Sequence, residues 1–306
     1  MSSPVEQPAG RNQPAWRSLL YVPANVPRFV DKAHARGADA IVLDLEDSVP
    51  PAEKPAARAG VRDAARRVRS GGADVLVRVN QPLALCVRDV EASVSAEVDG
   101  LVIPKVEGAS HVRLLDQLAS ELEAERGLPA GHNRFVLMIE TPDAFERMTE
   151  IARASARVAA IGIGAEDFAL YGGFEPDDET LLMPKQRMIL AARAAGVMPL
   201  GYIGSIADFS DWDAFRAMVR RSRRFGFDCA SCVHPGQVAV VNEEYAPRAE
   251  ELARARRIVE AGAQAQAEGR ASFQIDGRMI DVPVIERARR LLDRQRRLEA
   301  RRAPPG

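Results

Sequence analysis

Short apolar runs alternate with amphipathic stretches over most of the chain. Eight of these runs are rich in branched and aromatic side chains, and we interpret each of them as a β-strand. They span residues 18–23, 40–47, 75–80, 100–107, 134–141, 158–168, 198–204 and 229–235. Because these runs read as continuous apolar segments and not as alternating ones, they are typical of parallel strands that are covered on both faces.

The stretches between the runs carry helix-end signals. In residues 27–37, Pro27 suits the first turn of a helix and Gly37 suits the position after its last turn. Residues 211–226 place aspartates in the first turn and arginines in the last, as the helix dipole favours. Eight strand–helix units of this kind predict an α/β fold, a (β/α)8 TIM barrel, with a doubly wound sheet as the alternative.

Both ends of the chain lack this alternation of strands and helices. Residues 1–16 are polar and proline-rich without an apolar segment, so we expect a disordered N-terminus and not a signal peptide. The barrel is predicted over residues 17–244. Residues 245–306 are predicted to form a C-terminal extension or lid that packs on the barrel or on a neighbouring subunit. Its expected elements are a helix over 245–269, an extended segment over 270–283 that turns at Asp276-Gly277, and a basic helix over 284–302.

The composition narrows the function classes. The chain has 306 residues, of which 46% are hydrophobic, and its net charge of −1 gives no bulk attraction to nucleic acid or to a membrane surface. No apolar run reaches the ~18 residues of a membrane span. The arginines of the C-terminal helix are interleaved with acids, which favours a solvated face or a subunit contact over RNA binding. Three cysteines suit a reducing cytoplasm.

Cys229 and Cys232 form a CxxC pair, but they lie inside a predicted strand and not at the start of a helix. His234 follows them without a nearby fourth ligand for zinc. We therefore interpret both cysteines as core residues.

Polar residues stand at the carboxyl ends of five successive predicted strands, where barrels build their active sites. They are Glu46 and Asp47, Arg78 and Asn80, Lys105 and Glu107, Glu140, and Glu166 and Asp167. Carboxylates from several strands would repel one another in a shared cavity, and a divalent cation relieves that repulsion. Oxygen ligands without a nearby His or Cys favour Mg²⁺, with Mn²⁺ as a second choice. Taken singly, each acid could instead cap a helix or form a salt bridge.

We choose Glu140 and Asp167 as the metal ligands because each closes an apolar run. Arg78 then offers a fork for a substrate carboxylate. A metal beside such an arginine suits a 2-oxo acid, whose keto oxygen and carboxylate the two would share. The pattern therefore predicts a site for making or breaking a carbon–carbon bond next to a carbonyl.

The segment "RSLLYVPANVPRFVDKAHARGADAIVLDLEDSVPPAEKPAAR" resembles the start of the citrate lyase β-subunit-like proteins of the HpcH/HpaI aldolase/citrate lyase superfamily. "VLVRVN", "GLVIPKVE", "LMIETPDAF", "IGIGAEDFA", "GFDCASCVHPGQV" and "DGRMIDVP" resemble the same family in the expected order. The resemblance covers about residues 17–295. It implies a (β/α)8 barrel, Mg²⁺ on Glu140 and Asp167, and a 2-oxo acid held by Arg78 and Glu140.

The resemblance also implies roles outside the metal site. Glu46 and Asp47 would support the metal through its waters or orient the ligands. Asp281 of the "MID" motif would reach the site of an adjacent subunit as acid/base, in a homotrimer or hexamer. Lys54 and Arg17 are candidates for binding the substrate or the phosphates of coenzyme A.

The function that this resemblance implies is a Mg²⁺-dependent lyase for a 3-hydroxyacyl-CoA of the malyl- or citramalyl-CoA type. The alternatives are a citrate lyase β-subunit acting on a carrier-bound citryl thioester, an aldolase of free 2-oxo acids, and a barrel kept only as an interaction partner. The C-terminal extension favours a stand-alone enzyme over the β-subunit. The sequence departs from the family at Ser48, in residues 168–174, in residues 201–215 and at "DCASCVHP". We expect these departures to affect the substrate specificity and not the metal site.

Overall fold

The computed structural model describes residues 13–204, 211–270 and 272–302. Its main sheet has eight parallel strands in the order β7-β6-β5-β4-β3-β2-β1-β8, and a parallel bridge between Leu200 and Cys229 joins its two edges. The strands are β1 (Ser18–Pro23), β2 (Ala40–Asp44), β3 (Asp74–Arg78), β4 (Gly100–Ile103), β5 (Arg134–Ile139), β6 (Val158–Ile163), β7 (Met198–Leu200) and β8 (Ala230–Cys232). The fold is a (β/α)8 barrel, as the sequence pattern predicts.

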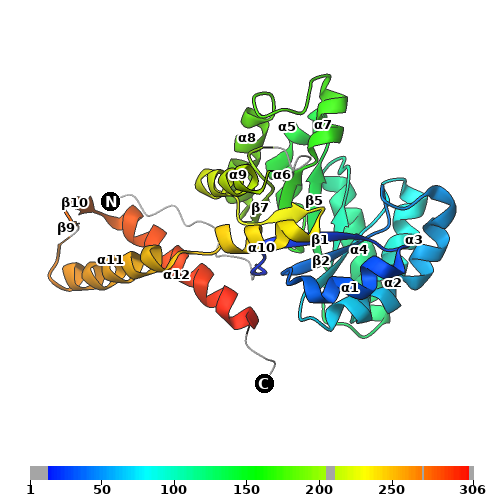
Figure 1. The fold of residues 1–306 in the computed structure, drawn as a ribbon, viewed down its shortest axis with the longest axis horizontal. Helices are drawn as coiled ribbons and strands as arrows, with labels where there is room; N and C mark the ends of the chain where they lie inside the picture. The colour runs from blue at the N-terminus through cyan, green and yellow to red at the C-terminus, as the bar shows by residue number, and fades with distance from the viewer. Residues whose placement is uncertain (1–12, 205–210, 271, 303–306) are drawn as a thin grey trace. The chain divides into compact units, whose positions relative to one another are not determined.

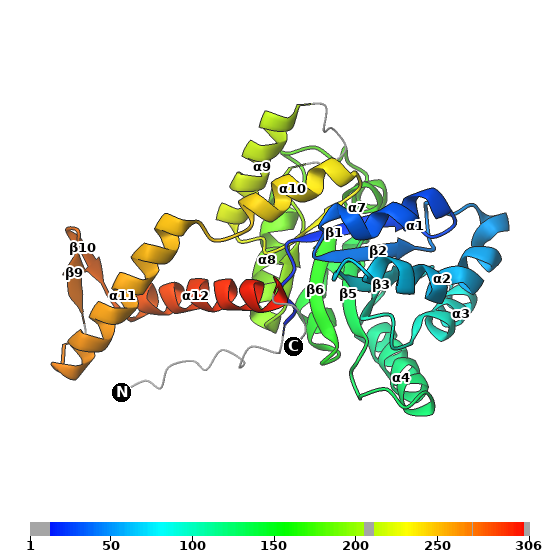
Figure 2. The ribbon, with the colours of Figure 1, turned by 60° about the horizontal axis from the view of Figure 1, so that its bottom comes forward.

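Helices follow the strands and surround the sheet (Figures 1 and 2). They are α1 (Pro27–Ala33), η1 (His34–Arg36), η2 (Pro51–Glu53), α2 (Lys54–Arg69), α3 (Leu83–Ser93), α4 (Ala109–Glu125), α5 (Pro142–Glu146), α6 (Met148–Arg153), α7 (Ala165–Gly172), α8 (Leu182–Ala195), α9 (Trp212–Phe225) and α10 (Pro235–Glu244). None of the helices in the described part of the chain is both long and apolar enough to cross a bilayer.

The barrel has two cores because its strands are covered on both faces. One core lies between the strands and the helices, and the other fills the barrel interior with side chains such as Leu19, Val42 and Leu76. Trp16 belongs to the inner core, is 1% exposed, and donates its indole N–H to Asp74. Trp16 is therefore not disordered as predicted, and residues 1–12 of the predicted disordered N-terminus lie outside the described residues.

Several strands end earlier than the apolar runs suggest. The run 158–168 divides into β6, which ends at Ile163, and α7, which begins at Ala165. Glu166 and Asp167 therefore lie in the first turn of a helix and not on a strand. This placement is favourable, since the positive end of the helix dipole stabilises acidic side chains.

Residues 246–306 form a separate compact unit. It contains α11 (Ala249–Ala267), the antiparallel pair β9 (Phe273–Ile275) and β10 (Arg278–Ile280), and α12 (Val282–Arg302). Asp276 and Gly277 have φ angles of 50° and 72°, which two-residue hairpin turns require, so the turn predicted there is confirmed. The small core of this unit is built around Ile258 and Ile280.

Candidate active site

The strand register brings Arg78 against the acidic end of β2. Asp44 and Arg78 are paired residues of β2 and β3, and both side chains line one cavity. Arg78 donates from Nε and Nη2 to the two carboxylate oxygens of Asp44, each at 2.7 Å. Ser48, which replaces the alanine usual in the resembled family, donates its hydroxyl to Asp44 at 2.5 Å. The guanidinium is thereby fixed in one plane and one position.

Two further carboxylates contact the remaining nitrogen of Arg78. Its Nη1 lies 2.8 Å from Glu46 and 3.2 Å from Asp47. Burial alone would raise the pKa of Asp44, but the hydrogen bonds and charge of Arg78 hold that pKa below its usual value. Burial raises the pKa of Glu46, against the charges of Arg78 and Lys105. Arg78 also lies over the ring of Tyr21, 5.4 Å from its centroid.

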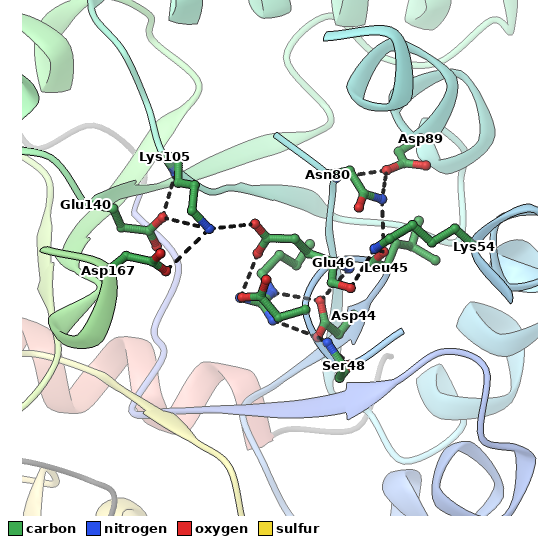
Figure 3. Close-up of polar contacts among 12 residues, drawn as sticks. Asp44, Leu45, Glu46, Ser48, Lys54, Asn80, Asp89, Lys105, Glu140 and Asp167 are labelled. Carbon is green, nitrogen blue, oxygen red and sulfur yellow. Dashed lines mark hydrogen bonds and ion pairs between the residues drawn. The ribbon is translucent and has the colours of Figure 1, made fainter. Parts of the chain in front are cut away.

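Lys105 joins this cluster to a second pair of carboxylates (Figure 3). Its ammonium lies 3.2 Å from Glu46, 3.3 Å from Asp167 and 3.9 Å from Glu140. Its backbone N–H donates to Glu140 at 2.9 Å, and its φ of 45° places a non-glycine residue in the left-handed region. Strained backbone of this kind concentrates at functional sites.

Glu140 is the more deeply buried acid of this second pair. It is 4% exposed, and burial raises its pKa to about 7, with Lys105 opposing the rise and the charges of Glu46 and Asp167 adding to it. Although burial alone would lower the pKa of Lys105, the charges of Glu46 and Glu140 raise it above its usual value. The pKa values of Glu140 and Lys105 therefore each depend on the charge of the other.

The donor set fits a divalent cation. Two basic side chains, Arg78 and Lys105, form ion pairs with five carboxylates: Asp44, Glu46, Asp47, Glu140 and Asp167. The carboxylates outnumber the basic groups, so negative charge remains in excess. The described residues contain no group of three or more His, Cys, Asp and Glu side chains arranged around a metal. Mg²⁺ needs only one or two carboxylates because it keeps several waters. Glu140 and Asp167 remain the residues that could hold it.

Gly164 makes room for Glu140. A Cβ atom at this position would lie 2.5 Å from Oε1 of Glu140 and 2.6 Å from its Cγ. Real contacts of a Cβ are not that short, so any side chain at position 164 would displace the carboxylate.

We therefore expect Gly164→Ala to weaken Mg²⁺ binding by about 10- to 100-fold, the range found when the support of a metal ligand is removed. Calorimetric titration with Mg²⁺ measures this affinity directly. Gly60→Ala is the matched control, because a Cβ at Gly60 on α2 meets nothing within 4 Å. Unchanged Mg²⁺ affinity in Gly164→Ala would argue against Glu140 as a ligand.

The cavity beside these groups has a volume of about 430 Å³. Its polar lining includes Asp44, Asp47 and Arg78 of the first cluster and Glu140 and Asp167 of the second. Leu200, Met188 and Phe227 contribute an apolar wall. A cavity of this size and mixed lining suits a small organic acid together with the end of a longer ligand.

Two predicted substrate-binding residues do not join the site. Arg17 directly precedes β1, at the opposite end of the barrel, where it is 4% exposed and bonded through Nε and Nη2 to Asp39. Lys54 donates to the carbonyl groups of Leu45 and Glu46 at 2.9 and 2.7 Å, so it holds the loop after β2 (Figure 3). We no longer assign substrate or phosphate binding to either residue.

Asp281 belongs to the C-terminal unit, between β10 and α12. Its backbone carbonyl accepts from the amides of Val284 and Ile285, and its half-buried side chain accepts from Val284 at 3.4 Å. The position of Asp281 in an assembled site stays a prediction.

Sequence reasoning did not select several residues that the fold brings to the cavity. Asp44 is the acid that fixes Arg78, and Lys105, which stands at a predicted strand end, connects Glu46 with Asp167. Lys185 of α8 also lines the cavity, together with Tyr21 of β1. Asp44 and Lys105 carry a recognisable signal, a charged residue at or just after the end of an apolar strand, whereas Lys185 lies within an ordinary helical pattern.

Comparisons with known proteins match most of the chain. The family model described as HpcH/HpaI aldolase/citrate lyase matches residues 17–235. "Citrate lyase subunit beta" of Leuconostoc mesenteroides subsp. cremoris is 33% identical over 284 residues, covering 92% of this chain and 93% of that protein. "L-malyl-CoA/beta-methylmalyl-CoA lyase" of Rhodobacter capsulatus is 32% identical, covering 89% and 92% of the two chains.

Among solved structures, the CitE protein of Mycobacterium tuberculosis in complex with magnesium, acetoacetate and coenzyme A has a TM-score of 0.71. It is 30% identical and covers 91% of this chain and 97% of that one. The match to the Leuconostoc β-subunit covers 92% of this chain. It must therefore include part of the C-terminal unit, residues 246–306. The C-terminal extension therefore does not distinguish a stand-alone enzyme from a β-subunit, contrary to our expectation.

Proposed function

The chain belongs to the HpcH/HpaI aldolase/citrate lyase family, and on that premise we propose that it is a Mg²⁺-dependent carbon–carbon lyase. The proposed substrate is a 3-hydroxyacyl-CoA of the malyl- or citramalyl-CoA type, and the products are an acyl-CoA and a 2-oxo acid. One observation carries the proposal: the carboxylates of Glu140 and Asp167 meet Lys105 at the edge of a cavity that Arg78 also lines.

Each residue of the cluster has a separate task in this proposal. Glu140 and Asp167 hold the cation, which when bound stabilises negative charge on the oxygen that becomes the keto group. Arg78 binds the substrate carboxylate, while Asp44 keeps the guanidinium in place. Glu46 bridges Arg78 and Lys105, and so orients both cations.

Cleavage moves the bonding pair of the carbon–carbon bond onto the carbon next to the thioester. The hydroxyl proton passes to water, and the new enolate carbon takes up a proton from an acid. We assign that acid to Asp281 of an adjacent subunit in a homotrimer or hexamer. Condensation is the reverse, with Asp281 as the base.

A citrate lyase β-subunit that acts on a carrier-bound citryl thioester is the second candidate. Support comes from the near full-length similarity to proteins of that name. An aldolase of free 2-oxo acids would use the same metal site without a thioester. The three cysteines are buried, and they suit either enzyme in a reducing cytoplasm.

A substrate panel separates these candidates. The panel contains malyl-CoA, citramalyl-CoA, citryl-CoA, a citryl thioester of acyl carrier protein, and the matching free acids, each with Mg²⁺. We expect release of a 2-oxo acid from the CoA thioesters. Turnover of the carrier thioester alone would favour the β-subunit, and turnover of the free acids alone would contradict a thioester lyase.

A further inference from the structure

Tyr21 of β1 is a half-buried residue that lines the cavity. Along β1, the side chains of Leu19 and Tyr21 point into the barrel, where Leu19 belongs to the inner core and Tyr21 packs against it. On the paired strand β2, Val42 lies opposite Tyr21, and Asp44 lies two residues further towards the carboxyl end. The ring of Tyr21 is therefore part of the cavity floor, below the level at which Asp44 holds Arg78.

Two polar groups contact the side chain of Tyr21. The guanidinium of Arg78 lies over the ring, 5.4 Å from its centroid, and the side chain of Ser231 on the neighbouring strand β8 forms a hydrogen bond with the phenol. Burial raises the pKa of Tyr21 to about 12, while the charge of Arg78 and the bond with Ser231 oppose the rise. The phenol therefore keeps its hydrogen at neutral pH. Because Ser231 can donate to the phenol oxygen, that hydrogen is left for an acceptor in the cavity.

A substrate carboxylate beside Arg78 needs a donor of this kind. Three carboxylates already contact the nitrogens of the guanidinium: Asp44, Glu46 and Asp47. Two of them, Asp44 and Asp47, also line the cavity together with Glu140, and their charges repel an incoming carboxylate. A neutral O–H group below Arg78 offers this anion a hydrogen bond without adding negative charge.

We propose that Tyr21 is a further substrate-binding residue, whose phenol donates a hydrogen bond to the carboxylate of the oxo-acid half of the substrate. The inference rests on the proposed function, because it takes Arg78 as the residue that binds this carboxylate. Arg78 then supplies the positive charge. Tyr21 supplies a hydrogen bond from a fixed direction, since its ring packs between the inner core and the guanidinium. The two donors together restrict how the carboxylate can turn.

Tyr21→Phe tests this role because it removes the hydroxyl and keeps the ring under Arg78. Calorimetry measures the affinity of the full-length variant for pyruvate and for lactate, each with Mg²⁺. We expect both affinities to fall by about 10- to 100-fold, the range that a hydrogen bond to a charged group provides. Affinities equal to those of the wild type would overturn the inference, because the ring would then act only by packing. A loss for pyruvate alone would place the bond on the keto oxygen and would also overturn it.

Two further variants separate the O–H donor from its surroundings. Tyr171→Phe changes an exposed tyrosine of α7 that is not among the residues lining the cavity, and it should leave both affinities unchanged. Ser231→Ala removes the neighbour of the phenol and should weaken the acids less than Tyr21→Phe does. If the phenol serves only to hold Ser231, the two variants lose affinity equally, and this result would refute the assignment.

The two proposals fail in different ways. If no thioester is cleaved but Tyr21→Phe still weakens the binding of pyruvate and lactate alike, the lyase proposal is wrong and the role of Tyr21 stands. If thioesters are cleaved and Tyr21→Phe binds both acids as the wild type does, the role of Tyr21 is wrong and the lyase proposal stands.

Discussion

Glu140→Gln and Asp167→Asn are each expected to lower kcat/KM for thioester cleavage by about 10³-fold or more. A bound cation supplies several kcal/mol of charge stabilisation in the transition state, and each ~1.4 kcal/mol corresponds to a factor of ten in rate. Glutamine and asparagine keep the shape of the side chains but remove the negative charge that Mg²⁺ requires. Glu140→Gln also removes a buried charge, so the barrel should still fold.

Activity alone would not separate a lost metal from a distorted cavity. Calorimetric titration with Mg²⁺ should therefore show that both variants lose binding, while circular dichroism shows an unchanged fold. Glu150→Gln, an exposed acid on α6, is the matched control and should bind Mg²⁺ and turn over as the wild type does. Full activity in both Glu140→Gln and Asp167→Asn would refute the metal assignment.

Asp281→Asn should lower kcat by about 10²- to 10⁴-fold, the usual contribution of a positioned acid or base. Binding of Mg²⁺ and of the oxo acid should not change, because neither uses the protonating acid. Asp293→Asn on α12 is the control, since the half-buried Asp293 pairs only with Arg296 and Arg297 among the described residues. Such surface pairs contribute little to stability.

Mixing variants tests whether the acid comes from another subunit. Asp281→Asn and Glu140→Gln are denatured, mixed in equal amounts and refolded together. If each site combines the barrel of one subunit with Asp281 of another, random assembly should restore activity to about a quarter of the wild-type value. A mixture as inactive as the separate variants would show that Asp281 does not act across subunits.

The barrel and the proposed metal ligands are predictable because their signals are local. A continuous apolar run marks a parallel strand, and the polar residue that ends it marks the functional end of the barrel. Glu140 follows from this pattern directly, and Asp167 is selected by it although it lies on α7. The boundary between β6 and α7 is harder to predict from the sequence, because the apolar run 158–168 continues into the helix without a break.

The remaining residues depend on contacts that no local pattern encodes. The bond between Asp44 and Arg78 follows from the register of β2 against β3. Arg17 resembles a binding residue in sequence, but it precedes β1 and pairs with Asp39 at the far end of the barrel. Lys185 lies on a helix, and only the packing of α8 brings its ammonium to Gly204 at the cavity.

The most direct test of the account is Mg²⁺-dependent release of a 2-oxo acid from a 3-hydroxyacyl-CoA by the purified wild-type protein. Malyl-CoA, citramalyl-CoA and citryl-CoA are incubated with Mg²⁺ or with EDTA, and the acyl-CoA and oxo acid are quantified by chromatography. We expect equal amounts of the two products from at least one thioester with Mg²⁺, and none with EDTA. Cleavage that persists in EDTA, or no cleavage of any of the three thioesters, would contradict it.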